Sequence, residues 1–297
     1  MNHTESVSGP KDSHRLITGI ALALIAGLAY SSEAIAAKLL YAQGLPPLAV
    51  LTWRFLLATL MFALWARPHY KSHHLHHAQL YTLFLLGLSQ GATVLFLFYA
   101  FMYIPAGLAI FLFYLYPTLV TVLEVLFLGI HPTKKRVLAL ILTLVGLVII
   151  AGPALSSVSW PGLLCAVAAA FGNAIFLILS DRSLDKLPVP IVSTGTTASA
   201  TAALFIIALV TQTPLTFSVT PINIGLMLFL VLVPSVLALG CLLAAISRLG
   251  PGRAAIVATA EPFFTTLLGF FILKEHLFIR ELIGGILIVL AVLLESR

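Results

Sequence analysis

Hydrophobic residues fill ten long runs along this chain, and short polar segments separate the runs. A helix needs about 20 mostly apolar residues to cross the hydrocarbon core of a bilayer. The runs predict spans near residues 16–42, 46–66, 79–101, 105–129, 137–155, 160–180, 189–211, 222–247, 253–273 and 277–294. The expected fold class is therefore an all-α integral membrane protein with ten transmembrane helices.

The hydrophobic pattern also repeats within the chain. Residues 100–142 match residues 245–287 at an offset of 145 positions, and Pro117 falls on Pro262 in this register. Each copy is the fourth of five spans running into the fifth. Because five is an odd number, the second half must enter the bilayer from the opposite side, which gives an inverted repeat of the kind that transporters use for alternating access.

The repeat predicts the domain organisation. We expect a first five-helix repeat over residues 16–155, a second over residues 160–295, and a central cavity between them. The polar residues 1–15 before the first span are expected to form a cytoplasmic tail, disordered at its start.

Composition and charge agree with a membrane protein. Hydrophobic residues make up 61% of the 297 residues, charged residues only 9%, and the mean hydropathy of +1.11 excludes a soluble fold. If the N-terminus is cytoplasmic, most of the 16 Lys and Arg residues lie in cytoplasmic segments, as the positive-inside rule requires. Both termini are therefore expected in the cytoplasm, and the net charge of +6 reflects topology rather than nucleic-acid binding.

Signs of enzyme or metal chemistry are missing from the sequence. Cys165 and Cys241 lie within predicted spans, where thiols behave as small hydrophobes. Metalloprotease, phosphate-loop and hydrolase motifs are absent. One run of histidines could in principle bind zinc. It consists of His73, His74, His76 and His77, and a solvated loop is its favoured interpretation. We expect no metal, no cofactor and no catalytic residues.

Four charged residues lie at least five residues from either end of a predicted span, and such a residue near a helix centre costs about 2.5 to 3.5 kcal/mol. Glu33 and Arg54 lie at similar depth, so they are expected to form a structural ion pair or to line the cavity. Glu261 is a candidate site for a substrate amine or a proton. Glu124 lies near the cytoplasmic end of its span, where water or the basic residues 134–136 are expected to solvate it.

Prolines interrupt three of the spans. Proline frees a backbone carbonyl one turn earlier and bends the helix, and interruptions at matching positions of two halves are typical of transporter gates. Pro117 and Pro262 are such a pair, with a static kink as the alternative. Pro234 and Ser235 interrupt the eighth span, where Gln90 stands near the corresponding depth of the third span.

Other polar side chains within spans are candidates for the cavity wall. Buried tyrosines usually need a partner for the hydroxyl, so Tyr30, Tyr99 and Tyr114 are expected to face a polar cavity. Asn173 cannot satisfy its amide locally and is expected there too. Hydroxyls at helical spacing can instead bond their own backbone, which is the favoured interpretation of Thr194, Thr197 and Thr201.

Several motifs resemble a known family. The segments EPFFTTLLG at 261–269, KEH at 274–276, LIGG at 282–285 and LTWRFLLA at 51–58 are similar to the EamA type of the drug/metabolite transporter superfamily. Within it, the aromatic-rich third and fourth spans most resemble the YddG-type amino-acid exporters of bacterial inner membranes.

This resemblance implies a compact bundle that exports aromatic, apolar and small neutral amino acids and related metabolites by alternating access, with no organic cofactor. It also implies a location in the bacterial inner membrane. Ten spans suffice for a cavity in one chain, and the oligomeric state stays open. Two alternatives remain: a multidrug transporter for cationic compounds, and an intramembrane enzyme that uses Glu33, Arg54 and Glu261 on a lipid-linked substrate.

Overall fold

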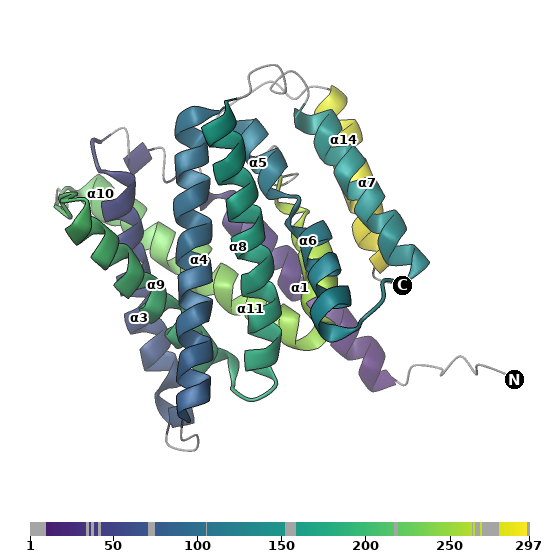
Figure 1. Cartoon of the computed structure of the whole chain (residues 1–297), viewed down its shortest axis with the longest axis horizontal. Helices are drawn as coiled ribbons and strands as arrows, with labels where there is room; N and C mark the ends of the chain where they lie inside the picture. Colours follow the sequence, from purple (N-terminus) through teal and green to yellow (C-terminus); the bar gives the residue numbers. More distant parts are fainter. Residues whose placement is uncertain are drawn as a thin grey trace, which may run out of the picture.

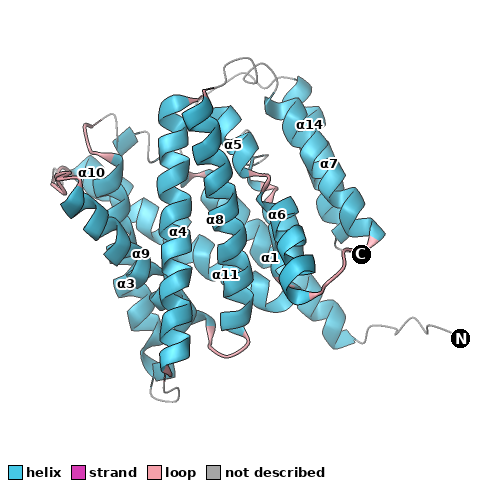
Figure 2. Ribbon diagram, viewed as in Figure 1, coloured by secondary structure: helices cyan, strands magenta, loops and turns pink. Residues whose placement is uncertain are grey.

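Every regular element in the described part of the chain is helical (Figure 2). The computed structural model describes residues 10–33, 36, 39–40, 43–70, 75–104, 106–151, 159–216, 219–262, 264, 268 and 279–295. The expectation of an all-α membrane protein is confirmed at this level. The predicted motif residues 274–276 and most of residues 263–270 lie outside the described part.

The helices follow the predicted runs closely. The first half contains α1 (Pro10–Ser31), α3 (Pro47–Tyr70), α4 (His77–Tyr103), α5 (Ala106–Phe113), α6 (Tyr116–Leu123), the π-helix η1 (Glu124–Leu128) and α7 (Lys134–Ala151). The second half contains α8 (Trp160–Leu184), α9 (Val189–Val210), α10 (Pro221–Leu230), the π-helix η3 (Val231–Leu237), α11 (Ala238–Leu249), α12 (Pro251–Ala258) and α14 (Ile279–Glu295).

Among the described residues, 6 helices are long and apolar enough to cross a membrane, one of them the continuous run Pro221–Leu249. The fourth and ninth predicted runs are broken into shorter pieces, so the count of ten spans stays a prediction. The first helix starts at Pro10, earlier than expected. Residues 10–15 of the predicted tail are thus helical. Proline is well suited to the first turn of a helix, which agrees with a start at Pro10. Residues 1–9 lie outside the described part.

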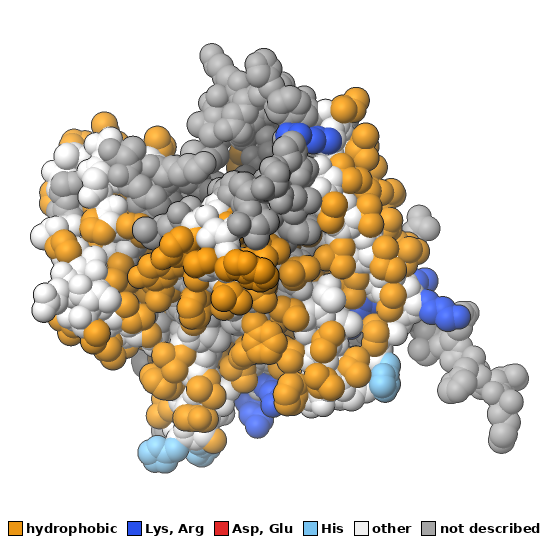
Figure 3. Space-filling view, turned by 45° about the horizontal axis from the view of Figure 1, so that its top comes forward, with side chains coloured by type: hydrophobic (Ala, Val, Ile, Leu, Met, Phe, Trp, Pro, Cys, Tyr) orange, Lys and Arg blue, Asp and Glu red, His pale blue; other side chains and the backbone are white. Residues whose placement is uncertain are grey.

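The closest helix packing joins the two halves. Extensive contacts link α4 to both α8 and α9, α3 to α9, α1 to α11, and α7 to α14. Figure 1 shows α4 beside α8, and α7 beside α14. Hydrophobic side chains cover much of the face seen in Figure 3, as a surface in contact with lipid requires.

Glycines allow these helices to approach closely. A Cβ added at Gly87 of α4 would lie 2.6 Å from the carbonyl oxygen of Thr196 and 2.7 Å from the backbone nitrogen of Ala200, both on α9. At Gly146 of α7 it would lie 2.7 Å from the carbonyl oxygen of Gly284 on α14. Small residues at helix contacts are expected in a membrane, since lipid gives no hydrophobic force that draws helices together.

The two halves are interrupted at equivalent positions. The fourth run breaks between α5 and α6 at Tyr114 and Leu115, just before Pro117. The ninth run breaks after α12 at Thr259 and Ala260, just before Pro262. These breaks coincide under the 145-residue offset of the repeat. The sequence repeat is thus also a repeat of local structure.

The helix contact at Gly87 can be tested by adding a single methyl group. Gly87→Ala should force α4 away from the α9 backbone and lower the stability of the purified protein by roughly 1 to 3 kcal/mol. The measurement is the midpoint of thermal unfolding in detergent. Gly225→Ala is the matched control, because an added Cβ there meets nothing within 4 Å; equal midpoints for the two variants would contradict the packing argument.

Candidate functional site

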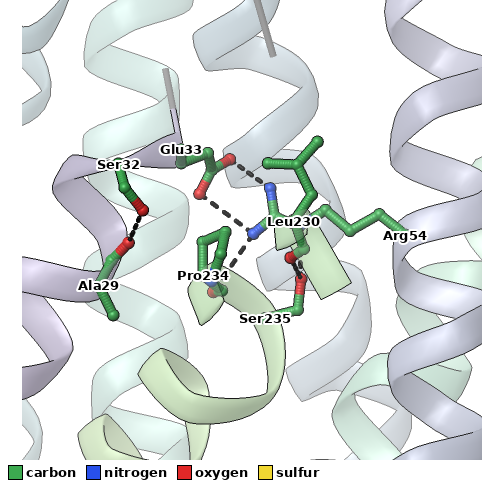
Figure 4. Close-up of polar contacts among 7 residues, drawn as sticks. All are labelled: Ala29, Ser32, Glu33, Arg54, Leu230, Pro234 and Ser235. Atoms are coloured by element: carbon green, nitrogen blue, oxygen red, sulfur yellow. Dashed lines mark hydrogen bonds and ion pairs between the residues drawn. The ribbon is translucent and has the colours of Figure 1, made fainter. Parts of the chain in front are cut away.

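The guanidinium of Arg54 is the centre of a polar cluster that joins three helices (Figure 4). Arg54 extends from α3, and only 4% of its side chain is exposed. Nη1 and Nη2 donate to the two carboxylate oxygens of Glu33, the second at 3.1 Å. Nε donates to Oγ of Ser235 at 2.6 Å, and Nη2 also approaches the carbonyl of Pro234 at 3.4 Å.

The π-helix η3 provides polar groups that solvate the charge of Arg54. Pro234 cannot donate a backbone hydrogen bond, which would leave a carbonyl of the preceding turn without its usual partner. The Ser235 hydroxyl donates to the carbonyl of Leu230 at 2.8 Å, and its oxygen then accepts from Arg54. The interruption of the eighth span therefore lets it hold a buried cation.

A second cluster surrounds Glu261, at the break in the ninth run. The Tyr114 hydroxyl and the Glu261 carboxyl lie close enough to act on each other electrostatically. The Tyr116 hydroxyl donates to the carbonyl of Ala255 at 3.3 Å. The rings of Phe113, Tyr114 and Tyr116 lie with centroids 5.3 to 5.7 Å apart. A half-buried carboxyl thus adjoins an aromatic wall.

Tyr116 and Glu261 are equivalent positions of the two repeats, since the offset of 145 carries one onto the other. Both side chains meet at this cluster, where the charge of Glu261 acts on the Tyr116 hydroxyl. Sequence reasoning did not select Tyr116 as a site residue. The repeat register was the signal that could have found it.

Tyr30 connects the two clusters. Gly27, Tyr30 and Glu33 follow one another at spacings of three residues, so they share one face of the first span. A Cβ at Gly27 would lie 3.5 Å from the backbone nitrogen of Glu261, which brings the first span against the break. The charges of Arg54, Glu33 and Glu261 all act on the Tyr30 hydroxyl.

Three further candidates lie apart from these clusters. Gln90 and Asn173 are half-buried on the packed helices α4 and α8, and Oε1 of Gln90 is buried without a hydrogen-bond partner. Tyr99 lies on the same face of α4 as Phe96 and Tyr103, and all three are exposed, Tyr99 by 41%. Tyr99 is therefore not among the buried residues of the two clusters, and a place for it in the cavity wall stays a prediction.

The threonines of the seventh span bond their own helix, as the favoured interpretation held. The hydroxyls of Thr194, Thr197 and Thr201 donate to carbonyls one turn earlier at 2.7 to 2.9 Å. Glu124 is paired with Arg136, one of the basic residues expected to solvate it, but it is buried and not exposed to water.

No group of three or more His, Cys, Asp or Glu side chains that could hold a metal ion occurs within the described ranges. Two of the four histidines in the predicted run, His73 and His74, lie outside those ranges.

Polar side chains that converge inside an apolar bundle, at breaks repeated in two halves, define a membrane transporter fold. The sequence pattern of the EamA-like transporter family matches this chain twice, over residues 17–152 and 160–297. The chain belongs to that family, within the drug/metabolite transporter superfamily, and is a multi-pass membrane transporter.

A solved structure entitled "Crystal structure of protein" has the same fold. It is 19% identical, covers 93% of this chain and 96% of its own length, and superposes with a TM-score of 0.77. Identity at this level establishes the fold alone. No curated protein sequence matches the chain significantly.

Removing one partner of the Arg54 cluster should destabilise the protein. Glu33→Gln leaves a buried guanidinium without its counter-charge, and we expect a loss of about 3 kcal/mol, near the low end for such pairs because Glu33 is itself 21% exposed. Unfolding in detergent by guanidinium or heat measures the loss. Arg248→Gln is the control, since Arg248 is exposed and bonds only a carbonyl of its own helix at 2.7 Å. A change below about 0.5 kcal/mol for Glu33→Gln would contradict the assignment.

Proposed function

We propose that this transporter exports amino acids and that Tyr30, Tyr114, Tyr116 and Glu261 form the binding site. The observation that carries the proposal is the half-buried carboxyl of Glu261 beside three tyrosine rings, at the point where the first span meets both helix breaks. A carboxylate next to aromatic faces suits an ammonium group, which gains both charge pairing and cation–π attraction.

The rest of an amino acid also finds complementary chemistry. Phe113, Tyr114 and Tyr116 offer apolar ring surface for a hydrophobic side chain. Arg54, whose charge also acts on Tyr30, adjoins the proposed site, and its guanidinium would meet the substrate carboxylate by exchanging Glu33 for that partner. Hydroxyls that can donate or accept allow neutral substrates of several sizes, so we propose a range that includes aromatic, apolar and small neutral amino acids.

Alternating access follows from the breaks before Pro117 and Pro262. Half-helices on either side of each break pivot about these points, while the interruption at Pro234 and Ser235 adjusts the eighth span. The resemblance to YddG-type exporters supports export as the direction of transport and the bacterial inner membrane as the location. The distribution of Lys and Arg supports cytoplasmic termini.

One alternative shares the same observation. A carboxylate flanked by tyrosines would also hold an organic cation that lacks a carboxylate, as in a multidrug transporter. Gln90 and Asn173 would then line the pathway in either case, since they lie on helices of both halves. No contact in the described part favours an intramembrane enzyme.

Counterflow in proteoliposomes tests the proposal. Vesicles that contain the wild type and are preloaded with unlabelled phenylalanine, methionine or threonine should accumulate the labelled compound without an ion gradient. Glu261→Gln removes the counter-charge of the ammonium and should lower the initial rate at least tenfold, and Tyr114→Phe should lower it several-fold.

Tyr99→Phe is the matched control, because it removes the same hydroxyl from an exposed position and should leave the rate unchanged. Exchange of a labelled organic cation without exchange of any amino acid would reject the proposed substrate class in favour of multidrug transport. Equal rates for wild type and Glu261→Gln would reject the proposed site.

A further inference from the structure

Glu124 joins the two halves at the end of the bundle where α11 turns into α12. It lies at the start of η1, and only 3% of its side chain is exposed. Nη1 of Arg136, on α7, donates to one carboxylate oxygen at 2.7 Å. The backbone N–H of Gly252, in the first turn of α12, donates to the other oxygen at 3.0 Å.

Gly252 has no space for a side chain. An added Cβ would lie 2.5 Å from Oε2 of Glu124 and 2.7 Å from Nη2 of Arg136. The carboxylate also lies at the positive end of α12, where negative charge is stabilised. Two residues of the first half, Glu124 and Arg136, thus hold the first turn of a helix from the second half at Gly252, and we call this contact of three residues the clamp.

The clamped elements are halves of the two broken spans. Glu124 directly follows α6, which begins at the break before Pro117. Gly252 lies in the first turn of α12, which ends at the break before Glu261. Glu261 lies nine residues beyond Gly252, about 13 Å along the chain at helical rise. The contact therefore ties together the half-helices that lead from this end of the bundle to the candidate site.

Two other hydrogen bonds between the halves at this end come from more exposed side chains. Arg15 of α1 donates to the carbonyl of Ser247 at 2.8 Å, and Arg182 of α8 reaches the carbonyl of Phe127 at 3.5 Å, both on exposed side chains. Glu124 is the buried acid of an ion pair here, and Arg136 is 12% exposed. Separation of the helix ends would let water solvate both charges. The pair of Glu124 and Arg136 can therefore break without leaving an unsolvated charge inside the membrane.

We propose that Glu124, held by Arg136 and bonded to Gly252, is the gating residue that keeps this end of the transport pathway closed. Transport requires the contact to open and re-form in each cycle. The proposal rests on the transporter family of the chain and not on the identity of the substrate.

The test measures access to each end of the bundle without any substrate. Single cysteines replace Ala255, which is buried behind the clamp, and Val50, which is buried among Leu40, Leu45, Met227 and Leu230 at the opposite end. Both are made with Cys165 and Cys241 changed to alanine. The rate of alkylation by a maleimide is measured for each, in the full-length protein in nanodiscs.

Glu124→Gln should raise the alkylation rate at position 255 about tenfold and lower the rate at position 50 several-fold, because opening one end closes the other in alternating access. Gly252→Ala should act in the same direction. It displaces the carboxylate while keeping both charges, so it provides the same readout if Glu124→Gln does not fold. Asp185→Asn, a charge removal at the exposed end of α8, should change neither rate.

A merely structural contact would behave differently. Faster alkylation at both positions, together with a lower unfolding temperature, would mean that Glu124 only stabilises the fold and would overturn the proposal. Unchanged rates at both positions in Gly252→Ala would overturn it as well. Since no amino acid takes part, neither result bears on the proposed substrate class.

Discussion

The cost of burying charge in an apolar bundle is the constraint on which this structure depends. Arg54 cannot lose its proton in a protein, so it must be solvated by protein groups wherever it is buried. The first span supplies a carboxylate, and the eighth supplies a hydroxyl and a carbonyl at its π-helical interruption. Three helices from both halves are thereby fixed relative to one another at one depth, and the candidate site forms beside them.

The pseudo-symmetry of the halves explains where the site lies. Breaks at equivalent positions bring Tyr116 and Glu261 to the same place, although one contributes a phenol and the other a carboxyl. The backbone of the two halves is thus pseudo-symmetric, whereas the side chains that the halves contribute to the site differ in chemistry. An amino acid is itself asymmetric, with a positive and a negative end, and the opposite charges of Glu261 and Arg54, which both act on Tyr30, suit such a solute in the proposed site.

Much of this architecture could be predicted from the sequence. Hydrophobic runs gave helices close to their observed bounds, and equal depth was enough to pair Glu33 with Arg54. Orientation about a helix axis was harder to predict. A span that is apolar on all sides has no amphipathic face to show which residues point inward, so the exposure of Tyr99 could not be predicted from the sequence.

Contacts between distant segments were the other limit. Counting residues placed Glu124 near the end of its span, which suggested a solvated carboxyl. It could not show that the first turn of α12, 128 residues later, would cover it. The hydrogen bond from Arg54 to Ser235 could not be predicted from the sequence either, because the depth of a residue in its span does not show which spans are neighbours.

The two broken spans also have a consequence for how the protein is made. α5 and α12 each contain 8 residues, which at about 1.5 Å per residue give roughly 12 Å, less than half the thickness of the hydrocarbon core. The turns at the breaks keep several local backbone hydrogen bonds but interrupt the regular helical pattern, so each broken span is less stable alone in lipid than an unbroken one. We therefore expect these spans to become stable only after the unbroken helices around them have assembled, which would make them the last parts of the bundle to fold.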